Sequence, residues 1–235
     1  MTESKIDLDA LGKNQLKNVA TGEVVEMSSL WATQPLVAIF FRRWGCVFCR
    51  LWAREVSKIA PQLQKNGVRL VGVGVEDVGV QEFSDGKFFD GELFVDVEKK
   101  TYKFLSFKRF SMFSVLTALF TSESRAAIAK GRAMKLGGDL RGDGLQNGGA
   151  LVVGAGGSGV LSYFKQERPA EVLDNAAILA ALGLQPEPQP QPAGDTEEKP
   201  KAEPPSDGTK VLEGKCEMNG AAGTPEKQQA ASAAE

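Results

Sequence analysis

Two short apolar runs separated by an amphipathic segment restrict the fold of this chain most strongly. The runs cover residues 36–43 (LVAIFFRR) and 68–75 (VRLVGVGV), and both are rich in aliphatic and β-branched residues. Such runs are typical of strands that are covered on both faces, as in a parallel sheet. Residues 46–65 between them carry apolar side chains at helical spacing: Phe48, Leu51, Trp52, Val56, Ile59 and Leu63. The pattern therefore predicts a βαβ unit.

The patterns downstream continue the alternation of strand and helix. They predict a strand over 92–96, helices over 99–107, 122–138 and 170–183, and a strand–turn–strand hairpin over 150–165. This order of elements is that of a thioredoxin-like domain. We therefore predict an α/β fold for residues 1–184, with a central mixed sheet flanked by helices.

The composition changes near residue 185. Eight of the eleven prolines lie between Pro186 and Pro225, and residues 185–210 hold almost no aliphatic or aromatic side chain. From residue 185 onward, ten acidic side chains accompany only five basic ones. Such a segment cannot bury enough apolar surface to offset the entropy that it loses on ordering. We predict a disordered tail over residues 185–235, which contains the lone Cys216.

Charge and hydropathy exclude several classes of protein. The formal net charge is −2, and residues 1–184 hold 23 basic and 20 acidic side chains, far from the basic field that nucleic-acid binding requires. The longest apolar runs are too short to cross a bilayer. The charged N-terminal segment lacks the apolar stretch of a secretory signal. We expect no nucleic-acid partner, no transmembrane segment and a cytoplasmic (cytosolic) location.

Cys46 and Cys49 lie in the stretch RRWGCVFCR, between the first predicted strand and its helix. A structural zinc ion needs four ligands, but the chain has no histidine and its only other cysteine lies in the tail. We therefore expect no metal, and the lack of histidine also removes any Cys–His or Ser–His–Asp site. Two interpretations remain, namely inert packing and a redox pair. The carboxyl edge of a parallel sheet is where such folds meet ligands, which favours the redox pair.

In the redox hypothesis, Cys46 is the nucleophile and Cys49 the resolving thiol. The first turn of a helix favours a thiolate at Cys46. Arg42, Arg43 and Arg50 add positive charge if their side chains point toward it, although paired arginines at a strand end are equally consistent with solvent exposure. Cys49, one turn further on, can displace a group bound to Cys46 and form a disulfide.

Aromatic and glycine patterns near these elements have competing interpretations. Trp44 could cover the redox site or contact an apolar substrate. Phenylalanines between residues 83 and 94 could pack in the core or form a lipid-binding loop. Gly154, Gly156 and Gly159 fit the G-x-G-x-x-G spacing of a dinucleotide-binding turn, but a strand rather than a helix follows them. This favours a hairpin turn and argues against direct NADPH binding there.

Several segments in order resemble the peroxiredoxin-like 2 family, from about Ile6 to Gly183. They are RRWGCVFCR, NGVRLVGVGVEDVGVQEF, DGELFVD, YKFLSFKRF and GDGLQNGGALVVGAGG. The resemblance implies a thioredoxin-like oxidoreductase of the cytosol that reduces the endoperoxide of prostaglandin H2 and prostamide H2 to the F2α products, with NADPH as electron donor. It places the family's Cys-x-x-Cys on Cys46 and Cys49. A thioredoxin system could deliver the electrons, which requires no nucleotide site in this chain.

Two departures from related folds affect the predicted site. Peroxiredoxins carry Thr or Ser three residues before the reactive cysteine, where this chain has Arg43. Thioredoxins carry a cis proline before the strand that faces the cysteine pair, where this chain has Asn147-Gly148-Gly149. The wall opposite Cys46 must therefore differ. Two further hypotheses remain open: a general thiol antioxidant or peroxidase, and a redox-regulated binding protein whose proline-rich tail recruits partners.

Overall fold

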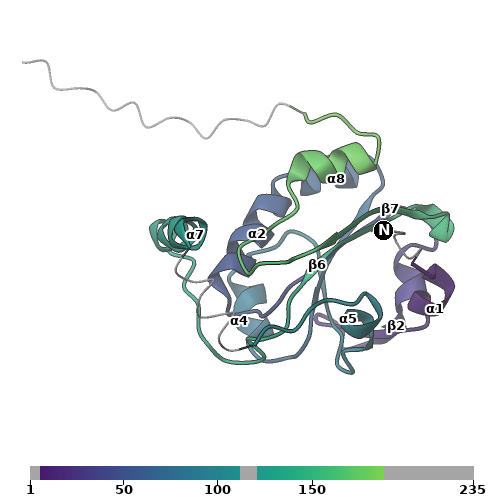
Figure 1. Ribbon diagram of the computed structural model, residues 1–235. Helices are drawn as coiled ribbons and strands as arrows, with labels where there is room; N and C mark the ends of the chain where they lie inside the picture. Colours follow the sequence, from purple (N-terminus) through teal and green to yellow (C-terminus); the bar gives the residue numbers. More distant parts are fainter. Residues whose placement is uncertain (1–5, 112–120, 188–235) are drawn as a thin grey trace, which may run out of the picture. The chain divides into compact units, whose positions relative to one another are not determined.

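The computed structural model describes residues 6–111 and 121–187, which belong to one unit, Met1–Pro190 (Figure 1). Residues 185–187 contact the third helix, where Gln62 Nε2 donates to the Gln185 carbonyl oxygen at 2.6 Å and Lys65 pairs with Glu187 at 2.8 Å. The predicted disordered tail lies, from residue 188 on, outside the described residues, and so does Cys216.

A mixed sheet forms the centre of the unit, and within the described residues it has seven strands in the order β2-β1-β5-β4-β3-β6-β7. Its middle strands β3, β4 and β5 are parallel, and the outer strands pair antiparallel. The bounds are β1 Gln15–Asn18, β2 Val24–Glu26, β3 Leu36–Phe40, β4 Arg69–Gly74, β5 Glu92–Val95, β6 Gly149–Val153 and β7 Val160–Lys165. The predicted α/β fold with a central mixed sheet is therefore confirmed.

Helices cover both faces of this sheet, as Figure 1 shows. One face carries α2 (Val47–Ser57), α3 (Ala60–Lys65), α4 (Val80–Asp85) and α8 (Asn175–Ala181). The other carries α1 (Leu8–Gly12), the 3-10 turn η1 (Met27–Leu30) and α5 (Lys100–Phe104). A further helix, α7 (Ser122–Ala133), packs against α2. None of the helices in these described ranges is long and apolar enough to cross a membrane.

Alternate residues of β3 separate the two hydrophobic cores. Val37 and Ile39 face the α2 side, whereas Leu36, Ala38 and Phe40 face the α5 side, and all five are fully buried. This period of two is the geometry of a strand with both faces covered. It explains why the run beginning at Leu36 is apolar without interruption, and it confirms the buried central strand that the sequence predicts.

The helix predicted over 46–65 is two helices, α2 and α3. At the junction the backbone N–H groups donate to the carbonyl three residues before them instead of four. Lys58 N donates to the Glu55 carbonyl at 3.2 Å, and Ile59 N donates to the Val56 carbonyl at 3.0 Å. The cause is Pro61, which has no N–H for the carbonyl four residues before it and whose ring crowds that turn. Proline is well placed only in the first turn of a helix, which is its position in α3.

The glycine motif after β6 forms the turn of a hairpin. The short 3-10 turn η2 (Ala155–Gly157) joins β6 to β7, and these strands are antiparallel. Gly156 and Gly157 have positive φ angles of 64° and 71°, which glycine adopts readily. Because a strand follows instead of a helix, the turn has no helix N-terminus that could bind a pyrophosphate.

Trp44 belongs to the core. Its ring is fully buried and lies 4.9 Å from that of Phe83, while its indole Nε1 donates to the Glu76 carbonyl at 2.6 Å. Gly74 makes room for it, because a Cβ atom there would lie 2.2 Å from the indole ring. The four phenylalanines of the 83–94 region are also buried, namely Phe83, Phe88, Phe89 and Phe94. Core packing is therefore their role in this fold.

We predict that Gly74→Ala lowers the free energy of unfolding by about 1–3 kcal/mol, because the new methyl group overpacks the core against Trp44. Gly159→Ala is the matched control, since a Cβ atom at Gly159 meets nothing within 4 Å. Its effect should stay within about 0.5 kcal/mol. Urea unfolding followed by circular dichroism measures both, and equal stability of the two variants would contradict the tight packing at Gly74.

Candidate active site

Cys46 and Cys49 lie at the start of α2, just beyond the carboxyl end of β3. Cys46 is the N-cap residue of the helix, with extended φ and ψ angles of −78° and 123°, and Arg50 N donates to its carbonyl oxygen at 3.0 Å. Both side chains are buried, with 4% and 2% of their surface exposed, and both are free thiols. The structure thus brings the two predicted residues together at the predicted strand-to-helix junction.

The two thiols have opposite tendencies to ionise. A hydrogen bond from the Cys49 side chain, helped by the positive charge of Arg42, outweighs burial and lowers the pKa of Cys46 from 9.0 to about 5. Burial, together with the hydrogen bond to Cys46, raises the pKa of Cys49 well above 9.0. At neutral pH the pair therefore consists of a thiolate at Cys46 and a protonated donor at Cys49.

Arg42 is the cation of this site. Its side chain is only 5% exposed, and its Nη1 atom lies 3.8 Å from Cys46 Sγ. Two backbone carbonyl groups hold the rest of the guanidinium, which donates from Nε to Gln146 at 3.3 Å and from Nη2 to Gly144 at 3.0 Å. Of the two environments that the sequence leaves open for Arg42, the structure shows the buried one beside the thiol.

Arg43 and Arg50 differ from Arg42. Arg43 is half-buried, and it contributes its charge and a carbonyl oxygen that accepts from Cys46 N at 3.2 Å. Arg50 is buried with its guanidinium bound elsewhere, to the carbonyls of Trp44 (3.1 Å) and Leu136 (2.8 Å) and to Glu82 Oε1 (2.7 Å). Arg50 therefore ties the start of α2 to α4 and to the segment after α7.

The wall beside Cys46 is the glycine-rich segment 137–148 between α7 and β6. Asp139 N donates to the Gly45 carbonyl at 2.9 Å, and a Cβ atom on Gly138 would lie 2.9 Å from the same oxygen. Gly148 lies so close to β3 that a Cβ atom there would meet the Phe40 carbonyl at 1.9 Å. This segment contributes the carbonyl groups that bind Arg42, and no local sequence pattern predicts that contact. The many glycines in this segment were the available sign of the contact, because glycine allows two backbone segments to approach closely.

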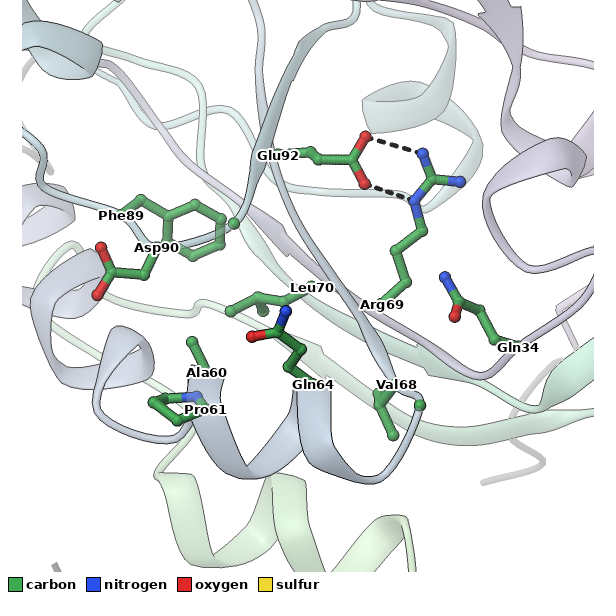
Figure 2. A pocket seen from close by; sticks show the side chains of 12 residues that line it. Gln34, Ala60, Pro61, Gln64, Val68, Arg69, Leu70, Phe89, Asp90 and Glu92 are labelled. Carbon is green, nitrogen blue, oxygen red and sulfur yellow. Dashed lines mark hydrogen bonds and ion pairs between the residues drawn. The ribbon is translucent and has the colours of Figure 1, made fainter.

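Two cavities lie away from the cysteines. One of about 620 Å³ is at the amino ends of β4 and β5, where Pro61 and Phe89 line it and Arg69 pairs with Glu92 at 2.7 and 2.9 Å (Figure 2). The second, of about 610 Å³, is lined by Trp31 and the η2 turn. Neither cavity is lined by a cysteine. Over the described ranges, no three His, Cys, Asp or Glu side chains are grouped so that they could hold a metal ion.

Comparison with known proteins identifies relatives over most of this chain. It is 44% identical to a prostamide/prostaglandin F synthase of Danio rerio and 45% identical to that of Homo sapiens, each over 77% of this chain and 90% and 91% of the relative. Residues 55–168 match a family model described as AhpC/TSA antioxidant enzyme, and this range begins after both cysteines.

Solved structures show the same fold at low identity. The bacterioferritin comigratory protein of Xanthomonas campestris superposes with a TM-score of 0.53 at 15% identity, over 78% of this chain and 96% of that one. Reduced Prx3 of Vibrio vulnificus superposes with a TM-score of 0.52 at 16% identity, over 76% and 96%. These likenesses confirm a thioredoxin-like, peroxiredoxin-type fold.

The hydrogen bond from Cys49 predicts how the thiolate responds to substitution. In a Cys216→Ser background, Cys49→Ser keeps a donor, so the thiolate absorbance at 240 nm should rise with a midpoint near 5. Cys49→Ala removes that donor and should raise the midpoint by about one pH unit or more. The same midpoint in both variants would show that the pKa of Cys46 does not depend on this hydrogen bond.

Proposed function

Because the chain belongs to the prostamide/prostaglandin F synthase family, we propose that it reduces the endoperoxide of prostaglandin H2 and of prostamide H2 to prostaglandin F2α and prostamide F2α. The observation that carries the proposal is the pairing of a thiolate at Cys46 with a protonated thiol at Cys49. An endoperoxide needs two electrons and two protons to become a diol, and a dithiol that closes to a disulfide supplies two electrons.

In the first step, the Cys46 thiolate attacks one oxygen of the O–O bond. A sulfur–oxygen bond forms, the O–O bond breaks, and the second oxygen leaves as an alkoxide that takes a proton from solvent. Arg42, with Nη1 3.8 Å from the sulfur, supports this step because a fixed positive charge stabilises both the thiolate and the negative charge that develops on oxygen. Its burial leaves that charge little screened by solvent.

In the second step, Cys49 attacks the sulfur of Cys46. The sulfur–oxygen bond breaks, the disulfide forms, and the released oxygen takes the proton that Cys49 gives up. The helix places Cys49 one turn from Cys46, so no large movement of the backbone is needed. The products are a diol and an oxidised cysteine pair.

The dithiol must then be restored by an external donor. We propose NADPH as the source of electrons, delivered by a thioredoxin system in the cytosol, where reducing conditions keep such pairs open. Delivery through a partner protein also agrees with the hairpin geometry of the glycine motif. A lipid substrate and a protein reductant would then use the same sulfur atoms in turn.

A second candidate function is the reduction of other peroxides. The match of residues 55–168 to an antioxidant enzyme family favours it, and a thiolate beside a buried guanidinium can attack any accessible O–O bond. In the redox-regulated binding hypothesis, by contrast, the cysteine pair would turn over neither substrate. Product analysis therefore separates the three.

We expect purified protein with thioredoxin, its reductase and NADPH to convert prostaglandin H2 to prostaglandin F2α. Cys46→Ser should reduce the rate to that of the uncatalysed reaction and Cys49→Ser should prevent turnover, whereas Cys216→Ser serves as the control with unchanged rate. The rate should fall as the pH drops through about 5, because protonation of Cys46 removes the thiolate. Full activity of Cys46→Ser would overturn the proposal. Consumption of hydrogen peroxide without F-type product would favour the second function.

A further inference from the structure

We infer that Asp143 is a positioning residue of the redox site, which fixes the backbone segment that aims Arg42 at Cys46. This inference deepens the proposed function, because it concerns the same thiolate. It can be tested without any substrate, so that failure of the proposed reaction and failure of this inference are distinguishable.

The direction of the Arg42 side chain depends on the segment 144–146. Two of its nitrogen atoms, Nε and Nη2, donate to the carbonyls of Gln146 and Gly144, which leaves Nη1 beside Cys46 Sγ. A long side chain with many rotamers keeps one orientation only if its partners stay in place. The positions of these two carbonyls therefore determine how close the positive charge lies to the sulfur.

Asp143 holds this segment from one side. Its carboxylate is 14% exposed and accepts from Arg109 Nη1 and Nη2 at 2.7 and 3.2 Å, from Lys99 Nζ at 3.0 Å and from Leu145 N at 3.2 Å. Although burial favours the neutral acid, the hydrogen bonds from Arg109 and Lys99 lower the pKa of Asp143 to about 2. The carboxylate is therefore charged at any pH at which the thiolate exists.

Arg109 links Asp143 to the segment that binds Arg42. Its Nη1 atom also donates to Gln146 Oε1 at 3.3 Å, and the backbones of Arg109 and Gln146 form an isolated antiparallel bridge. The next residue, Phe110, donates from N to the Leu145 carbonyl at 2.8 Å, and its ring lies 5.7 Å from the Arg42 guanidinium. Asp143 thus connects Lys99 and Arg109 to the segment 144–146, whose carbonyls bind the buried guanidinium of Arg42.

The sign of the expected effect separates positioning from direct electrostatics. The groups that act on the charge of Cys46 are Cys49 in α2 and the preceding Arg42 and Arg43. If Asp143 acted only through its negative charge, its removal would favour the thiolate and lower the pKa of Cys46. If Asp143 positions Arg42, its removal loosens the cation and raises that pKa.

The test measures the thiolate absorbance of Cys46 at 240 nm against pH, in a Cys49→Ser, Cys216→Ser background. Asp143→Asn should raise the midpoint by about one pH unit. Asp143→Glu keeps the charge but moves the carboxylate by one methylene group, so it should give a smaller rise. Glu98→Gln, which removes one negative charge from an exposed pair with Lys100, is the matched control and should leave the midpoint unchanged.

A double-mutant cycle connects the effect to the arginine. Arg42→Met should raise the midpoint at least as much as Asp143→Asn, and adding Asp143→Asn to Arg42→Met should give no further rise. A lowered or unchanged midpoint in Asp143→Asn, or full additivity with Arg42→Met, would overturn the inference. Urea unfolding of each variant verifies that it folds. If Asp143→Asn does not fold, Asp143→Glu is the deciding variant. An unchanged midpoint in Asp143→Glu would also overturn the inference.

Discussion

A buried positive charge at Arg42 is the interaction on which the rest of the site depends. In the described part of the chain, its partners are two backbone carbonyls, the Cys46 sulfur and the face of the Phe110 ring, and none of them is a carboxylate. A buried cation without an anion is costly, because it loses its hydration. A thiolate at Cys46 supplies the missing negative charge, so the buried arginine and the ionised cysteine stabilise one another.

This arrangement depends on a close approach between two backbone segments, namely residues 137–148 and the turn before α2. Gly45 and Gly138 leave no room for side chains where segment 137–148 meets the turn before α2. At the position of the threonine or serine of peroxiredoxins the chain has Arg43. The guanidinium beside Cys46 belongs to the residue before it, Arg42, and main-chain oxygens hold it there.

The sequence predicts single elements of secondary structure, but it does not predict contacts between residues far apart in the chain. The βαβ unit and the position of Cys46 follow from apolar periodicity, which reports the buried face of each element. The break between α2 and α3 was predictable in principle from Pro61, whereas β1 and β2 are too short for a clear pattern. The environment of Arg42 depends on carbonyls 102 and 104 residues away in the sequence, and no local pattern carries that information.

The opposite ionisation of the two thiols has a consequence for timing. The negative charge of Cys46 is one of the causes that keep Cys49 protonated. In the proposed reaction, this charge disappears when Cys46 binds an electrophilic oxygen. Ionisation of Cys49 then becomes easier at the step in which Cys49 attacks. Before that moment Cys49 is a poor nucleophile and does not compete for the electrophile. In the proposed reaction, burial and the charge of Cys46 together favour attack by Cys46 first and by Cys49 second.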